Sequence, residues 1–124
     1  MATVLLICIG ASMGALLRWK LGELLNSIFP AIPMGTLTVN LLGGFLMGIF
    51  LAVAAAKKIL PEAQFFIVTG FLGGLTTFST FSGELFYLFS HEAYLFSLLM
   101  LGAHVIGSLV ALAAGLYLTR LVLF

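Results

Sequence analysis

The nine charged side chains of this 124-residue chain are placed so that they leave four long charge-free segments. These segments are 1–17, 24–56, 63–83 and 93–119. A helix needs about 20 residues to cross a bilayer, because the hydrocarbon core is about 30 Å thick and each residue advances the helix by about 1.5 Å. The sequence therefore predicts an all-α membrane protein with four transmembrane helices.

Composition excludes several other classes of protein. Hydrophobic residues make up 63% of the chain and the mean hydropathy is +1.30, and one water-soluble domain of this length could not bury that much apolar surface. We therefore do not expect an enzyme. The net charge of +1 provides no basic patch for nucleic acid, and a single cysteine cannot form an intrachain disulfide.

Prolines and charges set the expected bounds of the helices. Pro33 can open the second span, because a proline in the first turn loses no helical hydrogen bond. Lys57 and Lys58 mark the following interface, and His91 and Glu92 separate the last two spans. We expect a single transmembrane domain over residues 1–124, with spans at about 3–25, 33–56, 62–90 and 94–120.

The basic residues that flank the spans favour neither orientation in the membrane strongly. The side that carries both termini has Lys57, Lys58 and Arg120, against Arg18 and Lys20 on the other side. Positive charge orients membrane proteins, so three residues against two specify orientation weakly. Our hypothesis is that the chain inserts both ways and forms an antiparallel, dual-topology homodimer. The alternative is a single orientation set by these few charges.

Pairs of glycines four residues apart recur along the chain. They are Gly10 and Gly14, Gly44 and Gly48, and Gly70 and Gly74. Such pairs let helix backbones approach closely in lipid, so we expect them at helix contacts. Arg18 lies on the Gly10–Gly14 face, where it could reach the membrane interface, hold a vestibule or hold a partner helix.

The third span contains an unusual polar segment. In residues 70–82, paired glycines are followed by five hydroxyl residues and two phenylalanines. The glycines favour a break in the helix that frees backbone carbonyls and N–H groups. Beyond it, helical spacing places four residues on one face, namely Thr77, Thr80, Phe81 and Glu84. Two roles are open for Glu84, a proton carrier or a hydrogen-bond acceptor, and Phe78 and Phe81 could serve packing or function.

Two further spans contribute polar side chains at intervals of one helical turn. Thr36 and Asn40 lie in the second span, and His104 and Ser108 lie in the fourth. The amide of Asn40 could bond to another helix or donate to a passing solute. His104 could be a neutral ring satisfied by a neighbouring helix or part of a functional site.

Three segments together resemble the Fluc (CrcB) family of bacterial fluoride channels. The segments are Gly35–Asn40 (GTLTVN), Gly73–Ser82 (GGLTTFSTFS) and Gly10–Arg18 (GASMGALLR). The resemblance covers essentially the whole chain, and the segment from Gly73 to Ser82 is its most specific part. It implies a passive, fluoride-selective channel in the bacterial cytoplasmic (inner) membrane, which exports fluoride and so reduces its toxicity.

The resemblance also implies an assembly and a set of functional residues. The family pattern is a dual-topology antiparallel homodimer with two fluoride pores and a structural sodium ion at its centre. The sodium would be bound by the backbone carbonyls of Gly73 and Thr76. The fluoride pathway would comprise Asn40, Phe78, Phe81, Thr77, Ser79, Thr80, Glu84 and Ser108. The resemblance assigns no role to His104.

The chemistry of these residues suits an anion, although no lysine or arginine lies in the middle of a predicted span. Aromatic rings are positive at their edges, Asn40 supplies N–H donors, and serine and threonine supply O–H donors. An anion could therefore lose water gradually without being trapped by a full charge, and a bound sodium ion would add positive potential nearby.

Two other functions are compatible with four membrane spans. The alternative is a small four-span proton-coupled exporter, a class that places an essential acid within the first span, whereas this chain has no acid before Glu23. A structural subunit of a larger membrane complex is compatible with the helix pattern, but it gives no account of the glycines and hydroxyls of the third span.

Overall fold

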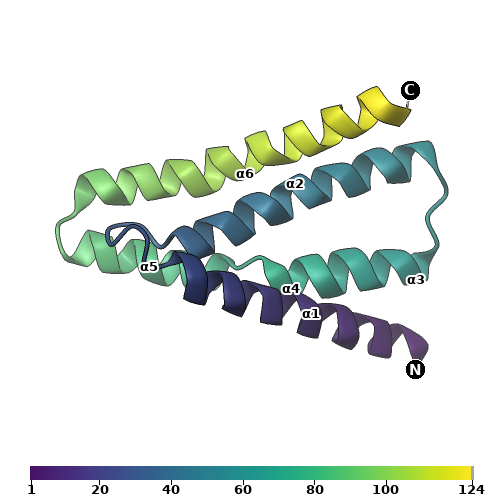
Figure 1. Cartoon of the computed structure of the whole chain (residues 1–124), viewed down its shortest axis with the longest axis horizontal. Helices are drawn as coiled ribbons and strands as arrows, with labels where there is room; N and C mark the ends of the chain where they lie inside the picture. Colours follow the sequence, from purple (N-terminus) through teal and green to yellow (C-terminus); the bar gives the residue numbers. More distant parts are fainter. Residues whose placement is uncertain (124) are drawn as a thin grey trace.

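The four predicted transmembrane helices are confirmed by a computed structural model of the chain, which describes residues 1–123. All secondary structure in this range is helical. Helices α1 (Ala2–Leu25), α2 (Met34–Ala56) and α6 (Tyr94–Leu123) each cover one span, and the segment Pro61–Ser90 covers the third. Both termini lie at the same end of the bundle, as an even number of spans requires (Figure 1).

The third span consists of several helical pieces. They are α3 (Pro61–Gln64), the π-helix η1 (Phe65–Leu72), α4 (Gly73–Leu75) and α5 (Phe78–Ser90). Pro61 occupies the first turn, where its missing N–H is harmless. Thr76 and Thr77 between α4 and α5 have extended backbones, with φ/ψ of −82°/154° and −148°/118°. The π-helical stretch has no signal in the local sequence pattern.

The helix bounds differ from the expected ones by a few residues. Helix α2 begins at Met34, because Pro33 is the capping residue and has an extended backbone with ψ of 100°. Helix α6 continues beyond residue 120 to Leu123. Arg120 lies in the last turn of α6, where a cation is favourable beside the unpaired carbonyls of the helix end.

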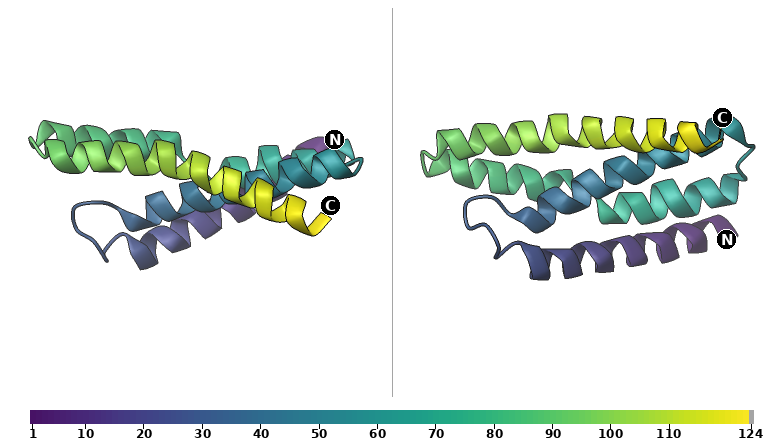
Figure 2. Two further views of the ribbon diagram at one scale, coloured as in Figure 1. Left: turned by 90° about the horizontal axis from the view of Figure 1, so that it is seen from above. Right: turned by 45° about the horizontal axis from the view of Figure 1, so that its top comes forward.

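The helices pack in pairs that cross one another. Helix α2 packs along α6, whereas α1 packs along η1 and α4, and α5 contacts mainly α6. Figure 2 shows that, at the end away from the termini, α5 and the start of α6 diverge from the end of α1 and the start of α2. The loop between α1 and α2 connects the two pairs, because Ile32 packs against the buried cluster of Phe81, Leu88 and Met100.

Glycines sit where the helices approach most closely. A Cβ atom on Gly14 would overlap the Phe71 carbonyl of η1, and one on Gly74 would overlap the Ala11 carbonyl of α1. On the other contact, a Cβ on Gly48 of α2 would overlap the Leu112 carbonyl of α6. The predicted role of the glycine pairs in helix packing is therefore confirmed.

Helix α6 offers a matched test of this packing. We expect Gly115→Ala to lower the free energy of unfolding by about 1–3 kcal/mol, because its Cβ would overlap the Phe45 carbonyl and force α2 and α6 apart. Gly102→Ala on the same helix is the control, because nothing lies within 4 Å of its Cβ position. Thermal unfolding in detergent measures both, and equal losses in the two variants would contradict the close-packing account.

Candidate functional site

The candidate site is centred on the extended backbone of Thr77, where α2 meets the third span. Asn40 projects from α2, and its Oδ1 accepts a hydrogen bond from the Thr77 N–H at 2.8 Å. The Asn40 Nδ2 donates to the Thr77 carbonyl at 3.0 Å. Extended residues inside a membrane need partners for their backbone polar groups, and one amide side chain supplies both for Thr77.

These bonds change the pairing of two carbonyls in the third span. In a continuous helix the Thr77 N–H would bond to the Gly73 carbonyl, and the Thr80 N–H would bond to the Thr76 carbonyl. Here Thr77 donates to Asn40, and the Thr80 N–H donates to Thr77 Oγ1 at 3.2 Å. Both N–H groups are therefore used elsewhere, and the carbonyls of Gly73 and Thr76 lose their helical donors.

Hydroxyl side chains cluster at the start of α5. Thr77 Oγ1 donates to Thr80 Oγ1 at 3.0 Å and lies 3.4 Å from Ser79 Oγ. Thr77 is also the side-chain cap of α5, a common role for threonine ahead of a helix. Thr77 is buried, while Ser79 and Thr80 are exposed on the surface of the single chain. The structure thus brings three of the predicted hydroxyl residues together.

Phe78 and Phe81 form an edge-to-face pair in very different surroundings. Their ring centroids are 5.6 Å apart with an interplanar angle of 66°. Phe81 is 4% exposed and belongs to a buried cluster, whereas Phe78 is 76% exposed on the surface of the chain. Ordinary packing within one chain accounts for Phe81 but not for Phe78.

His104 lies between two of the predicted site residues. Its ring stacks on Phe81, with centroids 4.3 Å apart and an interplanar angle of 24°. Its Nδ1 lies 3.1 Å from Asn40 Nδ2, and because that nitrogen is a donor, Nδ1 accepts and the neutral ring carries its proton on Nε2. Nε2 is buried and has no hydrogen-bond partner among residues 1–123. The interhelical bond predicted as one of two roles for His104 is present.

Glu84 is held from the second span and not by the hydroxyls of its own helix. Thr36 Oγ1 donates to Glu84 Oε1 at 2.7 Å, and Glu84 Oε2 is buried without a partner in the described part of the chain. This pair could not be predicted from local spacing, because the two residues are 48 positions apart. The available signal was the spacing of Thr36 and Asn40, which places both on one face of α2.

Most of the predicted site residues border one cavity. It is an open cavity lined by α2, the third span and α6, and Ser108 lines it one turn beyond His104. The members of the predicted set that line it are Asn40, Gly73, Thr76, Thr77, Phe78, Phe81 and Ser108. Thr80 lines a second cavity, which Thr36 and Thr77 also line. Ser79 contacts Thr77, and Glu84 accepts a hydrogen bond from Thr36.

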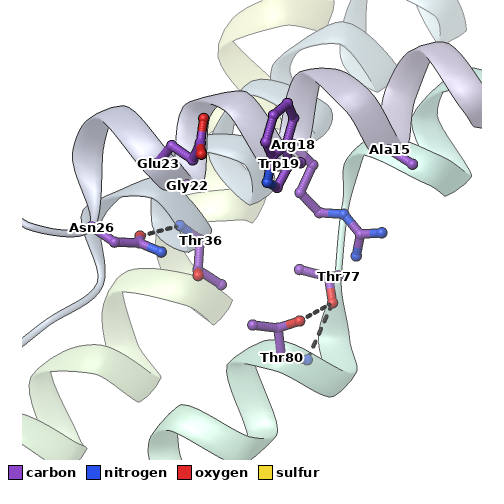
Figure 3. Close-up of a pocket in the computed structure, with 9 residues that line it drawn as sticks. All are labelled: Ala15, Arg18, Trp19, Gly22, Glu23, Asn26, Thr36, Thr77 and Thr80. Carbon is purple, nitrogen blue, oxygen red and sulfur yellow. Dashed lines mark hydrogen bonds between the residues drawn. The ribbon is translucent and has the colours of Figure 1, made fainter.

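The second cavity lies on the other side of Thr77. It has a volume of about 610 Å³, and Figure 3 shows the residues that line it from α1, α2 and the start of α5. The Arg18 guanidinium extends toward Thr77. Thr77 borders both cavities, so its side chain and backbone form part of the wall between them. Arg18 therefore lines this cavity together with Thr77 and Thr80.

Comparison with known proteins adds to this geometry. The family described as "CrcB-like protein, Camphor Resistance (CrcB)" matches residues 5–116. The chain belongs to the CrcB family. The resemblance seen in its sequence motifs is thereby confirmed.

Several relatives in this family are similar over nearly their whole length. A protein of Pseudomonas syringae pv. maculicola named "Fluoride-specific ion channel FluC" is 50% identical over 115 residues, covering 92% of this chain and 91% of the relative. Proteins of the same name from Pseudomonas putida (strain W619) and Desulfovibrio desulfuricans are each 48% identical over 92% of this chain, and 91% and 89% of their own lengths are covered. With its four apolar helices, this CrcB chain is a multi-pass bacterial membrane protein.

Proposed function

We propose that this CrcB chain forms a passive, fluoride-selective ion channel in the bacterial cytoplasmic membrane and lets fluoride leave the cell. The observation that carries the proposal is the identity of about half of all residues, over nine-tenths of the chain, with relatives named as fluoride-specific ion channels. In acid surroundings HF enters a cell and dissociates, and a passive channel then exports the trapped anion.

The site has donors for an anion but little fixed charge. Asn40 supplies amide hydrogens, and the hydroxyls of Thr77, Ser79 and Thr80 can rotate their protons toward a solute. The edge of the Phe78 ring offers weak positive potential on the exposed side of the pair. Such a track binds an anion weakly enough for it to leave again, as conduction requires.

Arg18 would act at the entrance of this track. Its guanidinium borders the second cavity next to Thr77 and Thr80, where it would raise the local concentration of anions. The cavity beyond Thr77 has no lysine or arginine side chain among its lining residues. Glu84, held by Thr36, and Ser108 would extend the track along α5 and α6.

The working unit would be an antiparallel homodimer. A single chain leaves Phe78 exposed beside a cavity, and a second copy would form the opposite wall. The flanking charges differ by only one between the two sides, which permits both orientations. Two copies related by a two-fold axis in the membrane plane place the same residues against each other.

A structural sodium ion would lie where the two copies meet. We take the extended residues Thr76 and Thr77 as the predicted break in the third span. The diverted N–H groups leave the carbonyls of Gly73 and Thr76 without helical donors, and carbonyl oxygens suit a hard cation. Two carbonyls are too few to replace a hydration shell, so both copies would contribute. The bound ion would supply positive potential near the anion pathway.

The proton-coupled exporter receives less support from the structure. That class uses an acid inside the first span, whereas the acid of α1, Glu23, lies near the end of the helix. Glu23 is exposed and pairs with Lys20 at 3.1 Å. Its position is typical of an interfacial ion pair and not of a proton carrier.

Liposomes that contain only this protein test the proposed function. We expect rapid release of fluoride and little release of chloride at equal gradients, because the narrow donor track suits the smaller anion. Release measured with ion-selective electrodes should require no proton gradient. Equal release of both anions, or fluoride release only when a proton gradient is imposed, would contradict a fluoride-selective passive channel.

Charge-locked variants test the antiparallel dimer. Lysines added to the loop at 57–60 should fix one orientation, and lysines added to the loops at 26–33 and 91–93 should fix the other. Each locked form alone should lose fluoride release, because parallel copies cannot form the two-fold interface. Co-expression of the two forms should restore it. Full release from one locked form by itself would refute the arrangement.

The phenylalanine pair tests whether ring edges contact the anion. We expect Phe78→Ile and Phe81→Ile to reduce fluoride release by roughly fivefold, because each removes a ring edge whose interaction is worth about 1 kcal/mol. Partial loss in one variant is compatible with compensation by the other ring. Dimer assembly, followed by size-exclusion chromatography, should be unchanged.

Ordinary packing makes a different prediction for the same positions. Under that hypothesis, the loss of release follows the cavity volume created, and bulky aliphatic replacements restore it. The double variant Phe78→Met, Phe81→Met therefore serves as the control. If it preserves both fluoride release and rejection of chloride, the ring-edge mechanism is wrong.

A further inference from the structure

The N-terminus of α2 is capped by a side chain from the residue that follows α1. Helix α2 follows Pro33, which has no side-chain acceptor, so its first N–H groups have no local partner. Asn26, which follows the last residue of α1, supplies one. Its Oδ1 accepts from the Gly35 N–H at 2.8 Å and from the Thr36 N–H at 3.3 Å. Figure 3 shows the second of these bonds.

Backbone contacts with α1 and with α2 hold Asn26 in place. The Asn26 N–H bonds to the Gly22 carbonyl at 3.0 Å and so continues α1. A Cβ on Gly35 would lie 2.6 Å from Asn26 Oδ1 and 2.7 Å from the Gly22 Cα, so the two helices are in backbone contact there. One residue therefore ends α1 and fixes the first turn of α2 against it.

The first turn of α2 in turn holds Glu84. Thr36, whose N–H bonds to Asn26, donates its hydroxyl to Glu84 Oε1 at 2.7 Å. Helix α5 has few other contacts with α2, so this bond is a main link between them. A shift of the Thr36 backbone would therefore move or break the bond to the carboxylate.

We propose that Asn26 is a positioning residue, which sets Thr36 through the first turn of α2 and thereby holds the Glu84 carboxylate beside the anion pathway. Its effect on conduction rests on the proposed channel function. Asn26 also lines the second cavity, so a direct contact with the anion is the competing explanation. The two explanations differ in whether the Glu84 carboxylate moves when the Asn26 cap is removed.

The test uses three variants in liposomes. Asn26→Leu removes the acceptor, and we expect fluoride release to fall by at least about tenfold, as small misplacements of functional groups can cost more than that. Asn26→Asp keeps an acceptor oxygen at the helix N-terminus, but its charge lines the cavity that the anion enters. Its release is therefore compared only with that of Asn26→Leu, and we expect it to be higher. Ser27→Leu, the exposed neighbour in the same loop, is the matched control and should release fluoride normally.

An infrared measurement reads the position of Glu84 without using fluoride. The chain has only four acidic side chains, so the difference between wild type and Glu84→Gln isolates the Glu84 carboxyl band. We expect Asn26→Leu to shift this band in the same direction as Thr36→Val, and Asn26→Asp to leave it unshifted. A tenfold loss of release with an unmoved band would overturn the proposal in favour of a direct contact.

The two arms separate this proposal from the proposed function. Unchanged release and an unmoved band in Asn26→Leu would refute the positioning role while the channel function stands. Wild-type liposomes that release no fluoride would count against the channel function alone. In that case the shift of the Glu84 band would still decide whether Asn26 positions Thr36.

Discussion

The pair of hydrogen bonds between Asn40 and the backbone of Thr77 is the interaction on which the rest of the site depends. It satisfies an extended residue inside the membrane, where an unpaired N–H or carbonyl would cost several kcal/mol. The same bonds draw the Thr77 N–H away from the Gly73 carbonyl, and Asn40 also orients His104 against Phe81. One amide therefore links α2, the third span and α6 at a single level.

Close backbone packing makes this interaction geometrically achievable. Glycines bring α1 against η1 and α4, and others bring α2 against α6, so the side chain of Asn40 can reach a backbone in the neighbouring span. The second polar link, between Thr36 and Glu84, lies one turn earlier on α2 and joins it to α5. The two links hold α5 at a fixed distance from α2 while leaving cavities on both sides of Thr77.

Sequence reasoning reached the features that depend on local pattern and composition. The four spans followed from where charges are absent, and the glycine pairs followed from a spacing that only close packing explains. A break is predicted at Gly73–Thr76; within this segment Gly73 and Gly74 are helical, and the extended residues are Thr76 and its neighbour Thr77, whose backbone bonds to Asn40. The Thr36–Glu84 pair and the Asn26 cap were out of reach, because partner choice between distant residues is decided by tertiary packing and not by local spacing.

The bonds of Asn40 and Thr77 take N–H donors away from the carbonyls of Gly73 and Thr76, where we propose that a cation binds. Thermal unfolding measured against sodium concentration tests this cation site directly. A cation that binds only the folded protein raises the unfolding temperature as its concentration increases. We predict that the wild type is more stable in sodium than in N-methylglucamine, and that Asn40→Leu loses this increment. Equal unfolding temperatures of the wild type in the two cations, or a full sodium increment in Asn40→Leu, would contradict the account.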